Sequence, residues 1–122
     1  MVKILVIDDD RHMRTACARA LSRAGWLVLS AETGDEGLQQ IRSGAQKIDV
    51  VLLDQLMPGT SGTEALAQIR AIDPNLPVVI MTGSITDDDA KAIKRLGAFD
   101  CLAKPFTPDQ LRDVIKRAVG KD

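Results

Sequence analysis

The sequence predicts an α/β fold in which helices cover both faces of a parallel sheet. Short runs of Val, Ile and Leu, each about five residues long, are typical of strands buried on both faces. Longer segments carry apolar residues three and four positions apart, which is typical of amphipathic helices. The two kinds of segment alternate five times along the chain, and this alternation favours parallel strands joined by helical crossovers.

The composition is that of one ordinary soluble domain. The chain has 122 residues, of which 45% are hydrophobic and 27% charged, and its formal net charge is −1. We therefore expect a single domain over residues 1–122, and no direct nucleic-acid binding, because no basic surface is implied. No apolar run approaches the roughly 20 residues of a membrane helix, and the MVKILV start lacks a signal-peptide cleavage site. The two cysteines form no disulfide or metal pattern and are expected to be buried thiols, which favours a cytoplasmic protein.

The strands are recognised by short apolar runs, and the helices by the residues at their ends. The strands are expected at 2–7, 26–31, 49–53, 77–82 and 99–103. Asp10 is a typical N-cap for the first helix, and Gly25 is a typical stop. The apolar face between them consists of Met13, Cys17, Ala20, Leu21 and Ala24.

The later helices also begin with chemical signals. TGDE at 33–36 and SGTE at 61–64 are capping-box patterns, and each precedes a helix, anchored by Leu38, Ile41, Leu66, Ile69 and Ile72. The fourth helix is expected at about 87–96, with an apolar face of Ala90, Ile93 and Leu96. Pro108 fits the first position of the last helix, where its missing N–H costs nothing.

Four predicted strands end in charged or hydroxyl-bearing residues. They are Asp8, Asp9 and Asp10 after the first strand, Asp54 after the third, Thr82 at the end of the fourth and Lys104 after the fifth. In parallel sheets of this type, ligands bind beyond the carboxyl ends of the strands. Singly, Asp10 is explained as a helix cap, Thr82 as a turn hydroxyl and Lys104 as a solvated charge. His12 is expected to be exposed, with no ligand role.

As a set, these residues indicate a metal-assisted site. Two unit charges 4 Å apart repel by about 4 kcal/mol at an effective dielectric constant of 20, so convergence of Asp8, Asp9 and Asp54 requires a cation. Carboxylate oxygens with room for water suit Mg²⁺, and Lys104 would offset part of the remaining charge. Mg²⁺, a carboxylate nucleophile, a hydroxyl and a lysine together favour phosphoryl transfer to an aspartate.

Four motifs in order, ILVIDDD, VVLLDQLMPGTSG, VVIMTGS and LAKPF, give the chain a resemblance to a known family. Over essentially its full length it resembles the receiver domain of bacterial two-component response regulators. The resemblance implies a doubly wound, flavodoxin-like (βα)5 three-layer sandwich, with a parallel five-stranded sheet in the strand order 2-1-3-4-5. It also implies a cis Lys104–Pro105 bond.

The resemblance implies a role for each matching residue. Asp54 would accept a phosphoryl group from a phosphohistidine on a sensor histidine kinase or phosphotransfer protein. Thr82 and Lys104 would be the switch hydroxyl and the phosphate-binding lysine. The metal site would consist of Asp9, Asp54 and the Leu56 carbonyl as direct Mg²⁺ ligands, with Asp8 holding metal-bound water. Leu56 and Ser84 would flank the path of the water that removes the phosphoryl group.

One position departs from the family pattern. The family commonly has an aromatic residue three positions before the lysine, and here that position is Cys101. Phe99 is expected on the same face of the fifth strand, because residues two apart in a strand share a face. The usual coupling between Thr82 and an aromatic side chain is therefore in question.

The function expected from the resemblance is a phosphorylation-activated signalling switch, which assists its own phosphorylation and dephosphorylation but is not a turnover enzyme. The surface of the fourth helix, fifth strand and fifth helix would report the change to an effector domain or downstream protein, or form a homodimer. A phosphorylation-independent interaction module is an alternative. A small Mg²⁺-dependent phosphatase with an aspartate nucleophile is a less favoured one, because it has no place for Asp54. The sequence leaves open whether the domain stands alone or was excised from a longer protein.

Overall fold

The computed structural model, described here for residues 1–57, 59–83 and 86–120, has the predicted fold. Five parallel strands form one sheet in the order β2-β1-β3-β4-β5. The elements are β1 (Lys3–Ile7), α1 (Arg11–Ser22), β2 (Leu27–Ala31), α2 (Gly34–Ser43), β3 (Val50–Asp54), α3 (Gly62–Ile72), β4 (Val78–Thr82), α4 (Asp87–Arg95), β5 (Asp100–Ala103) and α5 (Pro108–Gly120).

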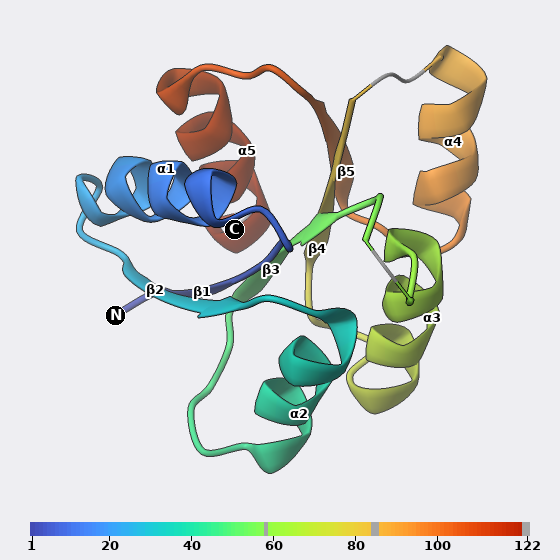
Figure 1. The fold of residues 1–122 in the computed structure, drawn as a ribbon, viewed down its shortest axis with the longest axis horizontal. Coiled ribbons are helices and arrows are strands. Elements are labelled where there is room, and N and C mark those ends of the chain that lie inside the picture. The colour runs from blue at the N-terminus through green and yellow to red at the C-terminus, as the bar shows by residue number, and fades with distance from the viewer. Residues whose placement is uncertain (58, 84–85, 121–122) are drawn as a thin grey trace.

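The sheet is the middle of three layers (Figure 1). One face is covered by α1 and α5, which pack against side chains such as Val6 and Met81. The other face is covered by α2, α3 and α4, which pack against side chains such as Leu53 and Ile80. Two apolar cores, one on each face, hold the sheet, and this is the flavodoxin-like arrangement expected for the family.

Burial on both faces, expected for every strand, holds only for the inner strands. All residues of β3 and β4 are buried, and β1 is buried beyond Lys3. The expectation was wrong for β2, where Leu27 and Ser30 are exposed, and for β5, which is only half-buried. The reason is position, because both are edge strands in the observed order.

The helix starts follow the sequence closely, with one difference. Asp10 caps α1 by accepting a hydrogen bond from the His12 N–H at 2.9 Å, and His12 is exposed, as expected. The predicted capping box at Ser61 is complete. The box at Thr33 is only half formed, since the Glu36 carboxylate accepts from the N–H of Glu32 instead of that of Thr33.

Three smaller expectations need correction. Ala24 lies beyond the end of α1 and is exposed, because the chain turns there at Gly25, whose φ is +87°. Leu96 caps α4 instead of anchoring it and is 55% exposed. Cys17 is a buried thiol, with its pKa raised to about 12 by burial, but Cys101 on an edge strand is only half-buried.

Candidate functional site

Three of the predicted acids meet at the carboxyl edge of the sheet. β1 and β3 are neighbours with Ile7 opposite Leu53, so Asp8 and Asp54 occupy equivalent positions at the ends of adjacent strands. Carboxylate oxygens of Asp8, Asp9 and Asp54 lie within 4.8 Å of one another. Asp8 and Asp54 are buried, at 0% and 5% exposure, whereas Asp9 is exposed.

Lys104 reaches this acid group from the other side. Its Nζ lies 3.0 Å from Oδ1 of Asp54 and 3.4 Å from Oδ2 of Asp8. Burial acts to lower the pKa of Lys104, but the hydrogen bond to Asp54 and the negative charge of Asp8 outweigh it and raise that pKa. The ammonium is therefore held in its charged form between the two buried carboxylates. The peptide bond between Lys104 and Pro105 is cis, as the resemblance implied.

Asp8 is the most firmly held of the acids. Its Oδ1 accepts from the Asp10 N–H at 2.9 Å, while its Oδ2 faces Lys104. Burial raises the pKa of Asp8, and the hydrogen bond from Asp10 only partly counters that effect. The Asp10 N–H and the Lys104 ammonium offset part of the cost of burying this charge.

The remaining predicted residues lie around this group. Thr82 ends β4 and is buried, at 8% exposure. Its carbonyl accepts from the Lys104 N–H at 2.7 Å, which joins the ends of β4 and β5. Leu56 follows β3 by two residues and is 77% exposed. Ser84 lies outside the described residues.

The acid group fits a divalent cation. Three carboxylates and one ammonium give a formal charge of −2 when all are ionised, and the oxygens are hard donors close enough to share one ion. Hard donors in this number suit Mg²⁺, which keeps several waters and takes only a few protein ligands.

Two residues that shape the site were not predicted. Arg14 on α1 donates from Nη1 to the carbonyl oxygen of Asp8 at 2.8 Å. Gly62 starts α3 so close to β3 that a Cβ there would lie 2.7 Å from the Asp54 carbonyl oxygen. The only sequence signal for Arg14 was its place one helical turn after Asp10. The only sequence signal for Gly62 was its place after a capping serine.

The expectation that Phe99 and Cys101 share a face was wrong. Phe99 packs against the core under α1 and α5, and Cys101 against the core under α2, α3 and α4. Strand β5 begins only at Asp100, so the two-residue alternation of a strand does not extend back to Phe99. Phe99 therefore does not replace an aromatic side chain at position 101.

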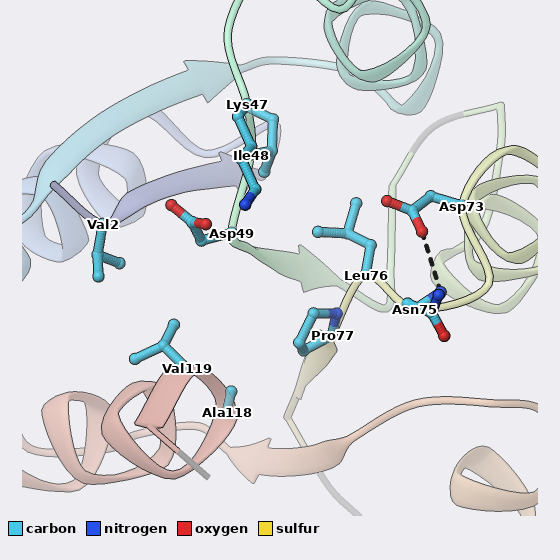
Figure 2. Close-up of a pocket in the computed structure, with 10 residues that line it drawn as sticks. All are labelled: Val2, Lys47, Ile48, Asp49, Asp73, Asn75, Leu76, Pro77, Ala118 and Val119. Atoms are coloured by element: carbon cyan, nitrogen blue, oxygen red, sulfur yellow. Dashed lines mark hydrogen bonds between the residues drawn. The ribbon is translucent and has the colours of Figure 1, made fainter. Parts of the chain in front are cut away.

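Two hollows adjoin the sheet at opposite ends. One of about 590 Å³ lies beside Thr82, and its lining includes Leu56, Ile93 of α4 and the capping residue Leu96. The other, of about 340 Å³, lies at the amino ends of the strands (Figure 2). The Asp49 carboxylate accepts from the N–H of Lys3 on the neighbouring strand, and the Asp73 carboxylate accepts from the N–H of Asn75 two residues later. Both carboxylates therefore serve the fold.

The comparisons with known proteins agree with this fold. The response regulator receiver domain family matches residues 4–116. Sporulation initiation phosphotransferase F of Bacillus subtilis is 35% identical over 94% of this chain and 91% of its own length. The transcriptional regulator NtrC of Escherichia coli K12 is 40% identical over 96% of this chain, which spans only 24% of that regulator. A receiver domain protein structure from Clostridium thermocellum superposes with a TM-score of 0.92 at 36% identity, covering 99% of this chain and 96% of that one.

A doubly wound sheet with an acid group and a lysine at its carboxyl edge defines a class of signalling domain. The chain belongs to the response regulator receiver domain family. Among the described residues, no helix is long and apolar enough to span a bilayer.

Proposed function

We propose that this chain is a phosphorylation-activated switch with Asp54 as its phosphoacceptor. A carboxylate oxygen of Asp54 attacks the phosphorus of a phosphohistidine on a sensor histidine kinase or phosphotransfer protein. The new O–P bond forms as the P–N bond breaks, and the imidazole leaves. The observation that carries this proposal is the placement of Asp54, which is buried, lies 3.0 Å from the Lys104 ammonium and is grouped with Asp8 and Asp9.

The residues around Asp54 divide the work. A Mg²⁺ ion held by Asp9, Asp54 and the Leu56 carbonyl, with its water held by Asp8, would offset the negative charge of the acids and of the incoming phosphoryl group. Lys104 binds a phosphoryl oxygen from the opposite side, and its firmly charged ammonium suits that role.

The switch follows from the charge placed on Asp54. A phosphoryl group brings up to two negative charges and three acceptor oxygens, which Lys104 and the Thr82 hydroxyl bind. Charge-assisted hydrogen bonds contribute roughly 1.5–3 kcal/mol each, and inverting a population from 1:99 to 99:1 takes about 5.5 kcal/mol. Two or three such bonds are sufficient to change the dominant conformation.

The surface of α4, β5 and α5 reports the change. Thr82 stands at the end of β4, ahead of α4, and Lys104 follows β5. Because Cys101 provides no aromatic ring and Phe99 faces the other core, the change passes from Thr82 to α4 without an aromatic side chain on β5, or the switch is a weak one. An effector domain, a downstream protein or a second copy of the chain then reads this surface.

One experiment tests the proposal against its alternatives. The protein is incubated with Mg²⁺ and acetyl phosphate, and its intact mass is measured. We expect one phosphoryl adduct, lost in Asp54→Ala and retained in Asp10→Asn, since the Asp10 side chain caps α1 and asparagine can take its place. Sustained phosphate release without an adduct would identify a phosphatase instead. Absence of both adduct and release would identify a phosphorylation-independent interaction module.

A further inference from the structure

Arg14 connects two loops beside the acid group. Its side chain is only 15% exposed, and its Nη2 lies 3.5 Å from Oε1 of Glu32, which follows β2. Its Nη1 donates to the main-chain carbonyl of Asp8 at 2.8 Å. One guanidinium thus holds the end of β1 on one side and the β2–α2 loop on the other.

The carbonyl that Arg14 binds completes the set of contacts around Asp8. The Asp8 N–H donates to the carbonyl of Ala31 at 3.2 Å, and its two carboxylate oxygens face the Asp10 N–H and Lys104. The carbonyl belongs to the peptide unit that joins Asp8 to Asp9. By fixing that peptide plane, Arg14 sets the direction in which the exposed Asp9 leaves the strand.

The side chain of arginine is suited to this bridge. Its planar guanidinium donates in two directions at once, whereas a lysine ammonium is a single point of charge on a flexible stem. Glu32 is itself oriented, because its N–H donates to Oε1 of Glu36 at 3.0 Å. The chain of contacts therefore runs from α2 through Glu32 and Arg14 to the acids.

We infer that Arg14 is a positioning residue that holds Asp8 and Asp9 in the arrangement that binds Mg²⁺. The inference rests on the proposed function for the identity of the ion. The contacts of Arg14 are with the Asp8 carbonyl and the Glu32 carboxylate. It acts on the main chain, and Glu32 acts through it.

Charge and positioning predict opposite effects when Arg14 is replaced. If Arg14 matters only as a positive charge near three acids, Arg14→Met should tighten Mg²⁺ binding, because a repulsive cation is removed. If Arg14 positions the acids, the same change should weaken binding, by about tenfold as for other residues that orient metal ligands. Arg14→Lys keeps the charge but not the two-way bridge, and should also bind more weakly than the wild type.

Arg112 provides a matched control. Its Nη1 donates to the carbonyl of Ala20 at 3.3 Å, and its Nη2 pairs with Asp109 at 2.6 Å. It is therefore a partly buried arginine that bridges a helix carbonyl and a carboxylate, with neither partner in the acid group. Arg112→Met should leave Mg²⁺ affinity unchanged.

The test measures the Mg²⁺ affinity of the full chain by isothermal titration calorimetry. Urea unfolding first shows that each variant is folded. Equal or tighter binding in Arg14→Met overturns the inference. Should that variant fail to fold, Arg14→Lys, which keeps the charge but not the two-way bridge, must show weaker binding than the wild type, and unchanged binding overturns the inference.

A second measurement separates this inference from the proposed function. Amide exchange at Asp10, whose N–H is bonded to Asp8, is measured without metal and should be faster in Arg14→Met than in the wild type. If the wild type binds Mg²⁺ and is phosphorylated while exchange and affinity are unchanged in the variant, only the role of Arg14 fails. If the wild type binds no Mg²⁺, the proposed function fails, and the positioning role fails with it whatever the exchange shows.

Discussion

Asp8 illustrates how much support one buried charge requires. The side chain is fully buried, and an unpaired carboxylate there would be strongly destabilising. The fold supplies the Asp10 N–H and the Lys104 ammonium to its two oxygens. Asp54 shares Lys104 with Asp8, and it is the acid that we propose as the reacting group.

Gly62 is the residue for which the site leaves least room. A Cβ there would lie 2.7 Å from both the Asp54 carbonyl oxygen and the Gln55 Cα, which are main-chain atoms that cannot rotate away. Gly62→Ala should lower the free energy of unfolding by about 1–3 kcal/mol, as expected for overpacking. Urea denaturation measures the difference.

Gly34→Ala is the control for that prediction. Gly34 is also the first residue of its helix, α2, but a Cβ there would make only ordinary contact with Thr60, at 3.4 Å. The change should cost less than about 1 kcal/mol. Equal losses of unfolding free energy in the two variants would contradict the prediction. They would show that the position at a helix start sets the cost, and not the close approach to Asp54.

At the scale of elements, α4, β5 and α5 are joined by charge as well as by packing. Asp100 at the start of β5 lies 3.4 Å from Nζ of Lys94 on α4 and 3.1 Å from Nη1 of Arg117 on α5. Arg117 also pairs with Asp113 on its own helix. Asp100, the neighbour of Cys101, thus links the three elements whose surface we propose to report phosphorylation.

Asp100 makes a pH-dependent contribution to stability. Burial acts to raise its pKa, but hydrogen bonds from the Cys101 N–H and Arg117 and the charge of Lys94 lower it below the ordinary value. A lowered folded-state pKa stabilises the protein above the unfolded value, near 3.8, and this stability is lost as pH falls through the folded-state pKa. Asp100→Asn should lower the free energy of unfolding at pH 7 by roughly 0.5–1 kcal/mol.

Urea denaturation at pH 7 and at about pH 3 measures this contribution, because the unfolded carboxyl is largely protonated at the lower pH. The difference in the free energy of unfolding between wild type and Asp100→Asn should be smaller at the lower pH. Asp113→Asn, at an exposed carboxylate paired with the same arginine, is the control and should have a smaller effect. A gap that stays constant between the two pH values would contradict the assignment.

At the scale of the whole molecule, repulsion among the three acids lowers the stability of the folded state, and the two apolar cores offset that loss. The inner strands are buried on both faces, and the three acids are grouped at one edge of that rigid sheet. A cation that binds the folded acids and not the unfolded chain must therefore stabilise the entire domain.

Mg²⁺ should raise the thermal midpoint of unfolding. At a free concentration 100 times the dissociation constant, the stabilisation is about 2.7 kcal/mol. Differential scanning calorimetry with and without Mg²⁺ measures it. Asp9→Asn should lose the shift, and Asp10→Asn should retain it, because asparagine caps a helix as well as aspartate does. Loss of the shift in both variants would point to general screening of charge.

Much of this organisation could be predicted from the sequence. The five strands and five helices follow from apolar periodicity, and most helix starts from capping residues that act within a few positions of each other. The site residues were recognisable because parallel strands bring their carboxyl ends to one edge. The expectation for Phe99 failed because the start of β5 decided which core it joined.

The sequence by itself determined the alternation of elements, the helix caps and the identity of the acids, because these depend on near neighbours in the chain. Only the tertiary structure decided that β2 and β5 are half-exposed edges, that Lys104 stands between Asp8 and Asp54, and that Arg14 binds the end of β1. These contacts join residues that are brought together by the order of strands and the packing of helices, and no local pattern encodes that geometry.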